Sequence, residues 1–375
     1  MFGALYAAWG VHVPSVKLHY EIGEQALAGA MLTAAGGGVL VLTRAGRIVG
    51  RFGPRSVALL GGQASAAALA LLLMLPSYPL LLVAMLVFGV ASGLFDVSIN
   101  AEASELERRA GRPMMSGFHA MFSLGGMAGA SAVGVLQRSG ISPLVQLWMC
   151  GGVAALAIVW GCALMLRMPR VAAGGTGWRM PKAALLLIGA LTAVGFVAEG
   201  AMYDWSVLYM RQEARADAGT AALAYASFSG AMAAGRFGGD AVRARLAPVG
   251  LLRLSAAVGG AGMAMALLAA QPVPALVGFA LVGLGFANIV PVLYSAAGRV
   301  PGVMPAQGIA TVSALGYLGI MGGPPLIGFV AQHSRLGLAL WIVVAAASLL
   351  AAAAGPAMRF AASPSGARHG RTRDS

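Results

Sequence analysis

The sequence predicts an all-α polytopic membrane protein, with twelve transmembrane helices arranged as two pseudo-symmetric six-helix bundles. Composition, the recurrence of apolar stretches and an internal repeat support this fold class. Of the 375 residues, 59% are hydrophobic and only 10% are charged, and the mean hydropathy is +0.82. Soluble domains carry about 25% charged residues. A chain of this composition is suited to a lipid bilayer rather than to water.

Apolar stretches of about twenty residues, the helix length that crosses a bilayer core, recur along the chain between short polar links. The first span is short and lacks the polar cytoplasmic lead found before most first spans, which is consistent with an upstream start codon or a truncated first helix. No cleavable signal peptide is visible. The predicted limits of the spans are 1–16, 26–43, 56–75, 80–101, 114–136, 144–166, 183–208, 220–238, 249–270, 275–298, 309–331 and 337–357.

Repeated motifs relate the two halves of the chain. The pattern A-G-R-x-x-G at 45–50 recurs at 234–239, 189 residues later. Three glycines recur at similar offsets, as the pairs Gly89 and Gly283, Gly126 and Gly319, and Gly129 and Gly322. Small residues let membrane helices approach closely, so the stretches 124–134 and 318–328 are predicted to be helix-packing faces. The repeat predicts like-oriented bundles at 1–166 and 183–357, a linker at 167–182 and a basic tail at 358–375.

The distribution of basic residues predicts the orientation in the membrane. The formal net charge is +13. With the N-terminus in the cytoplasm, 20 of the 25 Lys and Arg residues fall on the inward side and 5 on the outward side. This bias is the positive-inside rule, and it places both termini in the cytoplasm of a bacterial inner membrane. The charge therefore reflects topology, and no nucleic-acid-binding pattern competes with that interpretation.

Several motifs resemble the major facilitator superfamily. "AGRIVGRFGPR" is similar to its G-x-x-x-D-R-x-G-R-R loop, with Gly46, Arg51, Gly53 and Arg55 in register. Gly50 stands where the family has Asp, so the cytoplasmic latch that this Asp joins in many members lacks its acid. "FDVSINAEASELERRAGRPMMSGFHAMFSLGGMAGA", "EGAMYDWSVLY" and "GLGFANIVPVLYSAAGR" resemble the YbjJ-like branch, which is related to the fucose:proton symporter group.

The resemblance implies a transporter with the major facilitator fold and two cytoplasmic gate loops. The residues that it assigns to these loops are Gly46, Arg47, Arg51 and Arg55 in the first half, and Gly235, Arg236 and Asp240 in the second.

Membrane-embedded acids are the main candidates for proton coupling or gating. Asp96 lies ~24 Å along span four, and a carboxylate there costs at least ~2.5 kcal/mol unless it is wetted, paired or protonated. His119 of span five lies at a similar depth and could be its partner. Either Asp96 ties spans four and five together, or it is a protonatable or gating residue on the transport path.

Glu199 in span seven is the acid of the second half. Helix counting places it in the periplasmic third, ~18 Å from Asp96 along the membrane normal. Placing an acid at that depth costs free energy, so an acid without a function would be unfavourable there, which favours a functional role. Asp204 is predicted to have an interfacial, solvated or helix-capping role rather than to contact substrate, beside Trp205 and Tyr209 of an aromatic belt.

Aromatic and amide side chains near the middle of the membrane predict the substrate cavity. Each alone is typical of helix packing or interhelical hydrogen bonding, but together they suit a small polar or amphipathic solute. The cavity residues that we predict are Tyr6, Trp9, Asn100, Tyr203, Asn288 and Tyr317.

The sequence and the resemblance together predict a monomeric secondary active transporter, not an enzyme, whose partners are a small-molecule substrate, protons and lipid. Proton-coupled uptake of a sugar-like or other small polar compound is the first hypothesis. Efflux of an amphipathic compound or drug is the alternative, and a membrane sensor is the non-transport alternative. We expect no cofactor, because no phosphate-binding Gly-x-x-x-x-Gly-Lys-Ser/Thr loop and no metal-ligand spacing occurs.

Overall fold

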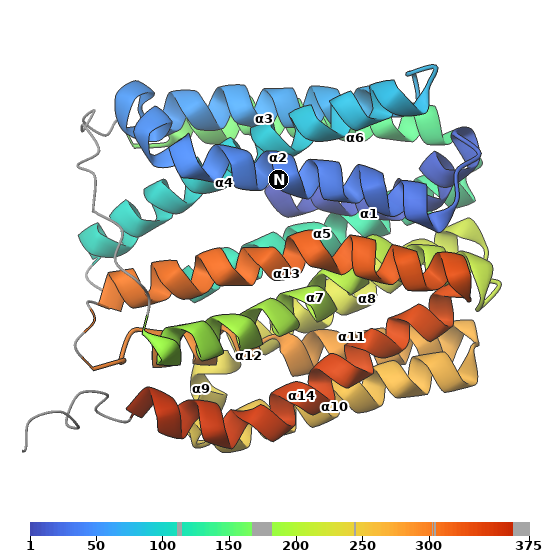
Figure 1. Ribbon diagram of the computed structural model, residues 1–375. Helices are drawn as coiled ribbons and strands as arrows, with labels where there is room; N and C mark the ends of the chain where they lie inside the picture. Colours follow the sequence, from blue (N-terminus) through green and yellow to red (C-terminus); the bar gives the residue numbers. More distant parts are fainter. Residues whose placement is uncertain (111–114, 167–181, 244, 302, 304, 363–375) are drawn as a thin grey trace, which may run out of the picture.

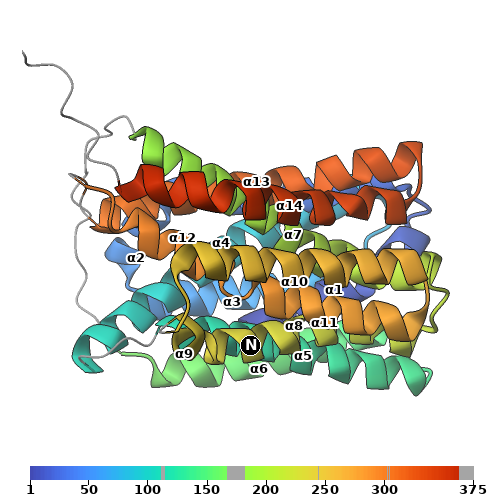
Figure 2. The same cartoon turned by 90° about the horizontal axis from the view of Figure 1, so that it is seen from below.

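The computed structural model describes residues 1–110, 115–166, 182–243, 245–301, 303 and 305–362, and every regular element in these ranges is an α-helix. The long helices run roughly along one direction, and their connections gather at the two ends (Figures 1 and 2). Their bounds are α1 Phe2–His19, α2 Glu24–Phe52, α3 Pro54–Leu71, α4 Tyr78–Ala110, α5 Met115–Arg138, α6 Pro143–Leu164, α7 Ala183–Gln212, α8 Ala218–Phe237, α9 Gly239–Arg243, α10 Pro248–Ala269, α11 Pro272–Phe286, α12 Ile289–Ala297, α13 Pro305–His333 and α14 Leu336–Ala362.

These helices follow the predicted spans in order. The short α9 lies between two spans, and α11 and α12 together form the tenth, broken at Ala287 and Asn288. Within the described residues, eight segments are long and apolar enough to cross a bilayer, and the bent α2 would be a ninth. Of the predicted linker at 167–182, only Lys182 lies within the described residues. The predicted tail begins inside α14, which continues to Ala362, and its remaining residues lie outside the described part.

The predicted loop between spans two and three is helical, which corrects the assignment of Gly46, Arg47 and Arg51 to a loop. Nothing in 44–52 breaks a helix as proline does, and arginine is a good helix former, so α2 continues to Phe52. The segment Arg44–Phe52 is bent by 61° from Glu24–Val41. Gly53 alone separates α2 from α3, and its φ of +85° is a conformation that glycine adopts without strain. Pro54 then occupies the first turn of α3, where its missing N–H costs nothing.

Packing within the two halves repeats at the glycines that the sequence repeats. A Cβ added to Gly89 of α4 would overlap the Ala34 carbonyl of α2, and one added to Gly283 of α11 would overlap the Phe228 carbonyl of α8. These two crossings are equivalent, because α2 and α4 correspond to α8 and the α11–α12 pair. Both crossings therefore depend on a missing side chain at the repeated glycine.

The two halves meet through α5 against α8, α2 against α13, and α1 against α7. Gly126 of α5 faces the Tyr225 ring and the Ser229 hydroxyl of α8, at 3.1 and 3.2 Å from its Cβ position. Gly322 of α13 differs from our expectation, because it is exposed and a Cβ there would meet no atom within 4 Å. The close contact belongs to Gly319, whose Cβ would overlap the Ala193 carbonyl of α7.

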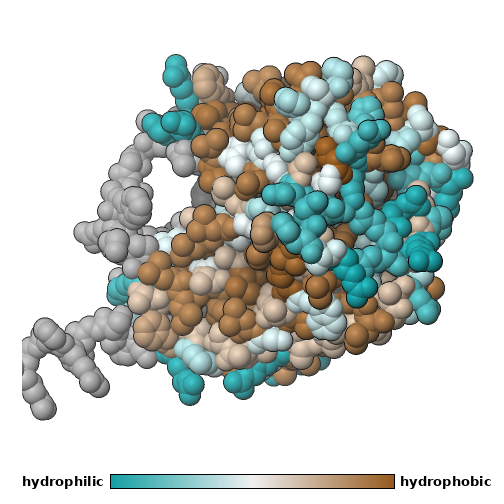
Figure 3. All heavy atoms as spheres, turned by 45° about the vertical axis from the view of Figure 1, so that its right-hand side comes forward, coloured by the Kyte–Doolittle hydropathy of each residue, from teal (hydrophilic) through white to brown (hydrophobic). Residues whose placement is uncertain are grey.

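The outer surface suits a lipid environment. Large apolar side chains such as Leu156, Trp160 and Leu268 are at least 70% exposed. Figure 3 shows apolar side chains over the flank of the bundle, while hydrophilic side chains gather toward the end where several helices connect. A soluble protein would expose few apolar patches of this extent, so the helix bundle is embedded in a membrane along its length.

Candidate transport site

An ion pair inside the helix bundle joins α7 to α8. Arg236 Nη2 donates to Glu199 Oε1 at 3.1 Å, and each side chain is only 12% exposed. Arg236 belongs to the last turn of α8, so its predicted place in a cytoplasmic gate loop is wrong. Arg236 was counted among the basic residues on the inward side, and its position inside the bundle removes it from the charges that set the topology. An apolar bundle accepts two buried charges when they are paired and hydrogen bonded, and this pair meets that condition.

The same ion pair reaches across to the first half of the chain. Arg236 Nη1 donates to Ser123 Oγ of α5 at 2.9 Å, so one guanidinium bridges the two halves. Tyr203 Oη donates to Glu199 Oε1 at 3.3 Å. His119, one turn before Ser123 on α5, is exposed and lies within electrostatic reach of both Arg236 and Glu199. The structure therefore brings His119 to the acid of the second half, whereas we expected it beside Asp96.

Asp96 forms a second polar group that also joins the halves. Asn100 Nδ2, one turn later on α4, donates to Asp96 Oδ1 at 2.9 Å. The Tyr317 side chain of α13 lies within electrostatic reach of the carboxylate. The half-buried Tyr6 of α1 lies within electrostatic reach. Asp96 thus faces α13 of the other half through Tyr317 and is hydrogen bonded to Asn100 on its own helix, and the sequence predicted both of these residues for the substrate cavity.

The observed helices bring the two acids closer in depth than predicted. Counted from the predicted periplasmic helix ends, Asp96 lies ~27 Å from Tyr78 and Glu199 ~20 Å from Gln212. The ion pair with the last turn of α8 agrees with this, since Arg236 lies near the opposite, cytoplasmic end. Glu199 is therefore deeper than the periplasmic third that we predicted. The estimate differs because α7 continues to Gln212, four residues beyond its predicted end.

Aromatic rings fill the space between these polar groups. Tyr6 contacts Phe2, Phe88 and Phe122, with ring centroids 5.1 to 6.1 Å apart. Phe122 in turn lies 6.3 Å from Tyr203, in an edge-to-face arrangement. The series joins α1, α4, α5 and α7, and Tyr6 and Tyr203 carry hydroxyls that keep polar atoms within it. Rings with polar groups at their edges can contact the apolar face of a solute while hydrogen bonding its polar atoms.

Two predicted cavity residues are engaged in helix contacts. Trp9 is 4% exposed, and its Nε1 donates to Asp204 Oδ1 at 3.4 Å. Asp204 therefore lies against α1, not at the membrane interface as expected. Asn288 is buried at the break between α11 and α12, and its Nδ2 donates to the Gly235 carbonyl of α8 at 3.4 Å. Gly235 itself packs against Ala287, so it belongs to a helix crossing and not to a gate loop.

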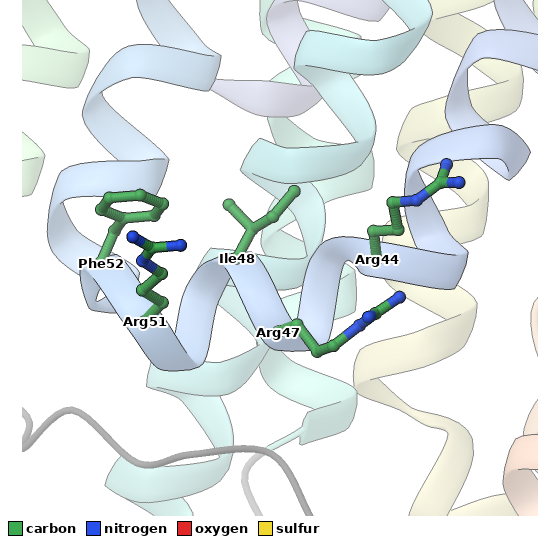
Figure 4. Close-up of a pocket in the computed structure, with 5 residues that line it drawn as sticks. All are labelled: Arg44, Arg47, Ile48, Arg51 and Phe52. Carbon is green, nitrogen blue, oxygen red and sulfur yellow. The ribbon is translucent and has the colours of Figure 1, made fainter. Parts of the chain in front are cut away.

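Arg47 and Arg51, two of the remaining predicted gate residues, belong to a basic surface on the bent end of α2. Arg44, Arg47, Ile48, Arg51 and Phe52 line a hollow of about 390 Å³ (Figure 4). The Arg51 guanidinium lies 5.3 Å from the centre of the Phe52 ring. Arg55 is the second residue of α3 and is half-buried, and Asp240 lies in the short helix α9. This surface is solvent-facing and separate from the ion pair inside the bundle.

No three or more His, Cys, Asp or Glu side chains within the described ranges are grouped as metal ligands would be. The polar centre instead offers acids, one buried cation, tyrosine hydroxyls and amides. These groups can bind and release a polar solute or a proton.

Comparison with known proteins decides the family. The sequence model described as "Major Facilitator Superfamily" matches residues 1–303. The chain belongs to the Major Facilitator Superfamily. It is similar to an uncharacterized MFS-type transporter of Yersinia pestis, with 34% identity over 93% of this chain and 91% of the relative. It is also 31% identical to the membrane protein MosC of Rhizobium meliloti, over 94% of this chain and 86% of the relative.

Solved structures of superfamily transporters share the fold. A D-xylose-proton symporter superposes with a TM-score of 0.76 at 15% identity, covering 94% of this chain and 95% of the other. The nucleoside transporter NupG superposes with a TM-score of 0.71 at 13% identity, covering 96% of each chain. The protein is therefore a multi-pass membrane transporter of this superfamily, with relatives that are transporters and not enzymes.

The pairing of Glu199 with Arg236 was not predicted from the sequence. A signal was available, since the predicted eighth span ended at residue 238 and so contained Arg236. A cation inside a predicted span calls for an acid on a neighbouring helix, and α7 supplies it. The repeated A-G-R-x-x-G motif obscured this, because its first copy lies at a membrane surface.

Proposed function

We propose that the protein is a secondary active transporter that takes up a small polar solute, sugar-like in its hydroxyl content, by alternating access coupled to protons. The observation that carries the proposal is the Glu199–Arg236 pair with its bridge to Ser123. It places ionisable groups at the contact between the two halves, which must separate and re-form as access alternates. Asp96 with Tyr317 repeats this arrangement at a second inter-half contact.

The lining supports a small polar substrate. Tyrosine, asparagine and serine side chains accompany the aromatic series, which suits a solute with an apolar face and several hydroxyls. Two solved structures with the same fold are named as a D-xylose-proton symporter and a nucleoside transporter, and both names refer to polar solutes. The motifs quoted above support a place in the YbjJ-like branch. We further propose a bacterial inner-membrane location with both termini in the cytoplasm, based on the positive-inside bias.

The test separates energy coupling from substrate binding. In proteoliposomes, Asp96→Asn and Glu199→Gln should insert, and at least one should lose gradient-driven accumulation while it retains counterflow exchange. A neutral side chain of the same shape cannot release a proton during the cycle, but it leaves the substrate contacts in place. Glu105→Gln is the matched control, since Glu105 lies nine residues after Asp96, near the end of α4, and pairs with Arg109. It should accumulate substrate like the wild type.

Thermal unfolding must accompany the transport assay, because Glu199→Gln leaves Arg236 without its counter-ion. If both variants accumulate substrate at wild-type rates and with the wild-type pH profile, the coupling hypothesis is wrong. Reversing the imposed gradient distinguishes uptake from efflux of an amphipathic compound. A protein that binds the solute but exchanges none in vesicles would be a sensor.

A further inference from the structure

Asp204 is an acid inside the bundle to which the ion pairs above give no role. It lies one residue after Tyr203 on α7, eight residues before that helix ends, and it faces α1 through the hydrogen bond from Trp9. The indole N–H is a neutral donor, and the bond is long at 3.4 Å. An ionised buried carboxylate is normally stabilised by a cation or by two or three donors. Asp204 has one weak donor among the described residues.

Asp204 itself is half-buried, and α1 packs closely on α7 and α8 beside it. Gly10 of α1 presses against α7, and a Cβ there would lie 2.5 Å from the Tyr203 carbonyl oxygen and 2.7 Å from the Tyr225 ring. The Tyr225 hydroxyl is buried without a hydrogen-bond partner in the described part of the chain. Polar atoms in this contact between α1, α7 and α8 are therefore poorly satisfied. An added negative charge would make the contact less stable.

The ionisable groups around Asp204 do not compensate it. Tyr6 from α1 and Tyr225 from α8 are within electrostatic reach, and both are neutral phenols. Arg236 of α8 is engaged by Glu199 and Ser123. The sequence of α11 contains no ionisable side chain. The remaining helices packed on α7 carry further ionisable groups that interact with other partners or lie at a helix end. Tyr294 interacts with Ser313, Tyr317 with Asp96 and His333 with the Phe329 carbonyl, and Arg359 lies in the last turn of α14.

The contact of α1 with α7 belongs to the side on which the halves are closed. At the predicted periplasmic end, Gln212 Nε2 donates to Glu24 Oε1 at 3.2 Å, and Gly328 of α13 packs against Ala28 of α2. Opening this side would separate α1 from α7 and admit water to Asp204. The half-buried carboxyl would thus be partly shielded from water in one conformation and more fully hydrated in the other.

We propose that Asp204 is a proton-binding site that links protonation to the closure of α1 against α7. The neutral acid fits the closed contact, and water accepts its proton when the contact opens. Low pH then favours the closed periplasmic side and high pH favours opening. The site does not depend on Asp96 or Glu199 carrying a coupled proton, so it goes beyond the proposed function.

The test measures the conformation directly. Spin labels at Leu18 of α1 and Val273 of α11, which are 80% and 71% exposed, report the distance between the halves at the predicted periplasmic ends. Cys150 and Cys162 are replaced by serine, and the protein is held in lipid nanodiscs. From about pH 5 to about pH 9, the wild-type distance distribution should shift from shorter to longer. Asp204→Asn should hold the short distance throughout. Asp217→Asn, an exposed acid at the same end, should behave like the wild type.

Two further measurements keep the proposal falsifiable. Infrared spectra should show a protonated carboxyl band at low pH that Asp204→Asn lacks. Trp9→Phe removes the one hydrogen bond to the ionised form, so the midpoint of the distance change should move to higher pH, whether or not the Asn variant folds. A wild-type distance that is independent of pH overturns the proposal, as does an Asn variant that responds like the wild type. Neither readout uses substrate or a gradient, so failure here is distinct from failure of transport.

Discussion

Arg47 of α2 and Arg236 of α8 occupy the same position of the repeated A-G-R-x-x-G motif, one in each half of the chain. Arg47 is exposed, on a segment bent by 61° from the rest of α2. Arg236 lies within the bundle and pairs with Glu199 of α7. The helix that corresponds to α7 in the first half is α1, and its sequence contains no acid. A repeated arginine therefore enters the bundle only where the neighbouring helix provides a counter-ion.

The comparison predicts a large difference between two equivalent substitutions. Arg236→Met should destabilise the protein by about 3–5 kcal/mol, because it leaves Glu199 as an unpaired charge in the bundle. Arg47→Met changes an exposed side chain and should cost less than about 0.5 kcal/mol. Thermal unfolding in detergent measures both. Similar losses of stability for the two variants would show that Arg47 and Arg236 play the same structural role in the two halves. The double variant Arg236→Met with Glu199→Gln should recover part of the loss, since no buried charge is left unpaired.

The glycine repeat gives the next largest effect. Gly126→Leu and Gly319→Leu should each destabilise by about 1–3 kcal/mol, because the added side chain overfills a helix crossing. Gly322→Leu is the matched control on the same helix as Gly319, and it should be nearly neutral because its Cβ points into open space. Expression level and unfolding temperature separate the three variants. A damaging Gly322→Leu together with a tolerated Gly319→Leu would mean that α13 is rotated relative to α7.

The smallest effect concerns the helix starts that precede the two motifs. The Asp217 carboxylate caps α8 by accepting from the Thr220 N–H at 3.0 Å, whereas α2 begins after Gly23 without a side-chain cap. Asp217→Ala should cost about 0.5–1 kcal/mol at neutral pH, and Gly23→Ala has no carboxylate cap to remove.

This cap should also depend on pH. Hydrogen bonds from Thr220 lower the pKa of the Asp217 carboxyl below its usual value. The cap is therefore fully present above the unfolded-state pKa, and it is lost as the pH falls through the lowered folded-state value. Unfolding temperatures of wild type and Asp217→Ala should converge in that acidic range. A difference that persists at lower pH would contradict the carboxylate cap.

Features that depend on local composition could be predicted from the sequence. The helical spans and the close contact at Gly126 follow from apolar length and from small residues on one helix face. Features that depend on the register between helices could not. The pairing of Arg236 with Glu199 is set by how α7 and α8 slide past each other, and the place of Asp204 is set by the rotation of α7 toward α1. The helical end of α2 was missed because arginines were interpreted as loop residues.

The Glu199–Arg236 pair also bears on biogenesis. Both charges belong to one antiparallel hairpin, α7 and α8, whose connection is the five residues 213–217. An insertion machinery that releases spans as hairpins would meet the two charges together, and each would neutralise the other as they enter lipid. Ser123, which completes the contact, lies earlier in the chain and is already synthesised by then. The second half of the protein can therefore begin its assembly against a first half that is already in the membrane, without leaving an isolated charge in the hydrocarbon.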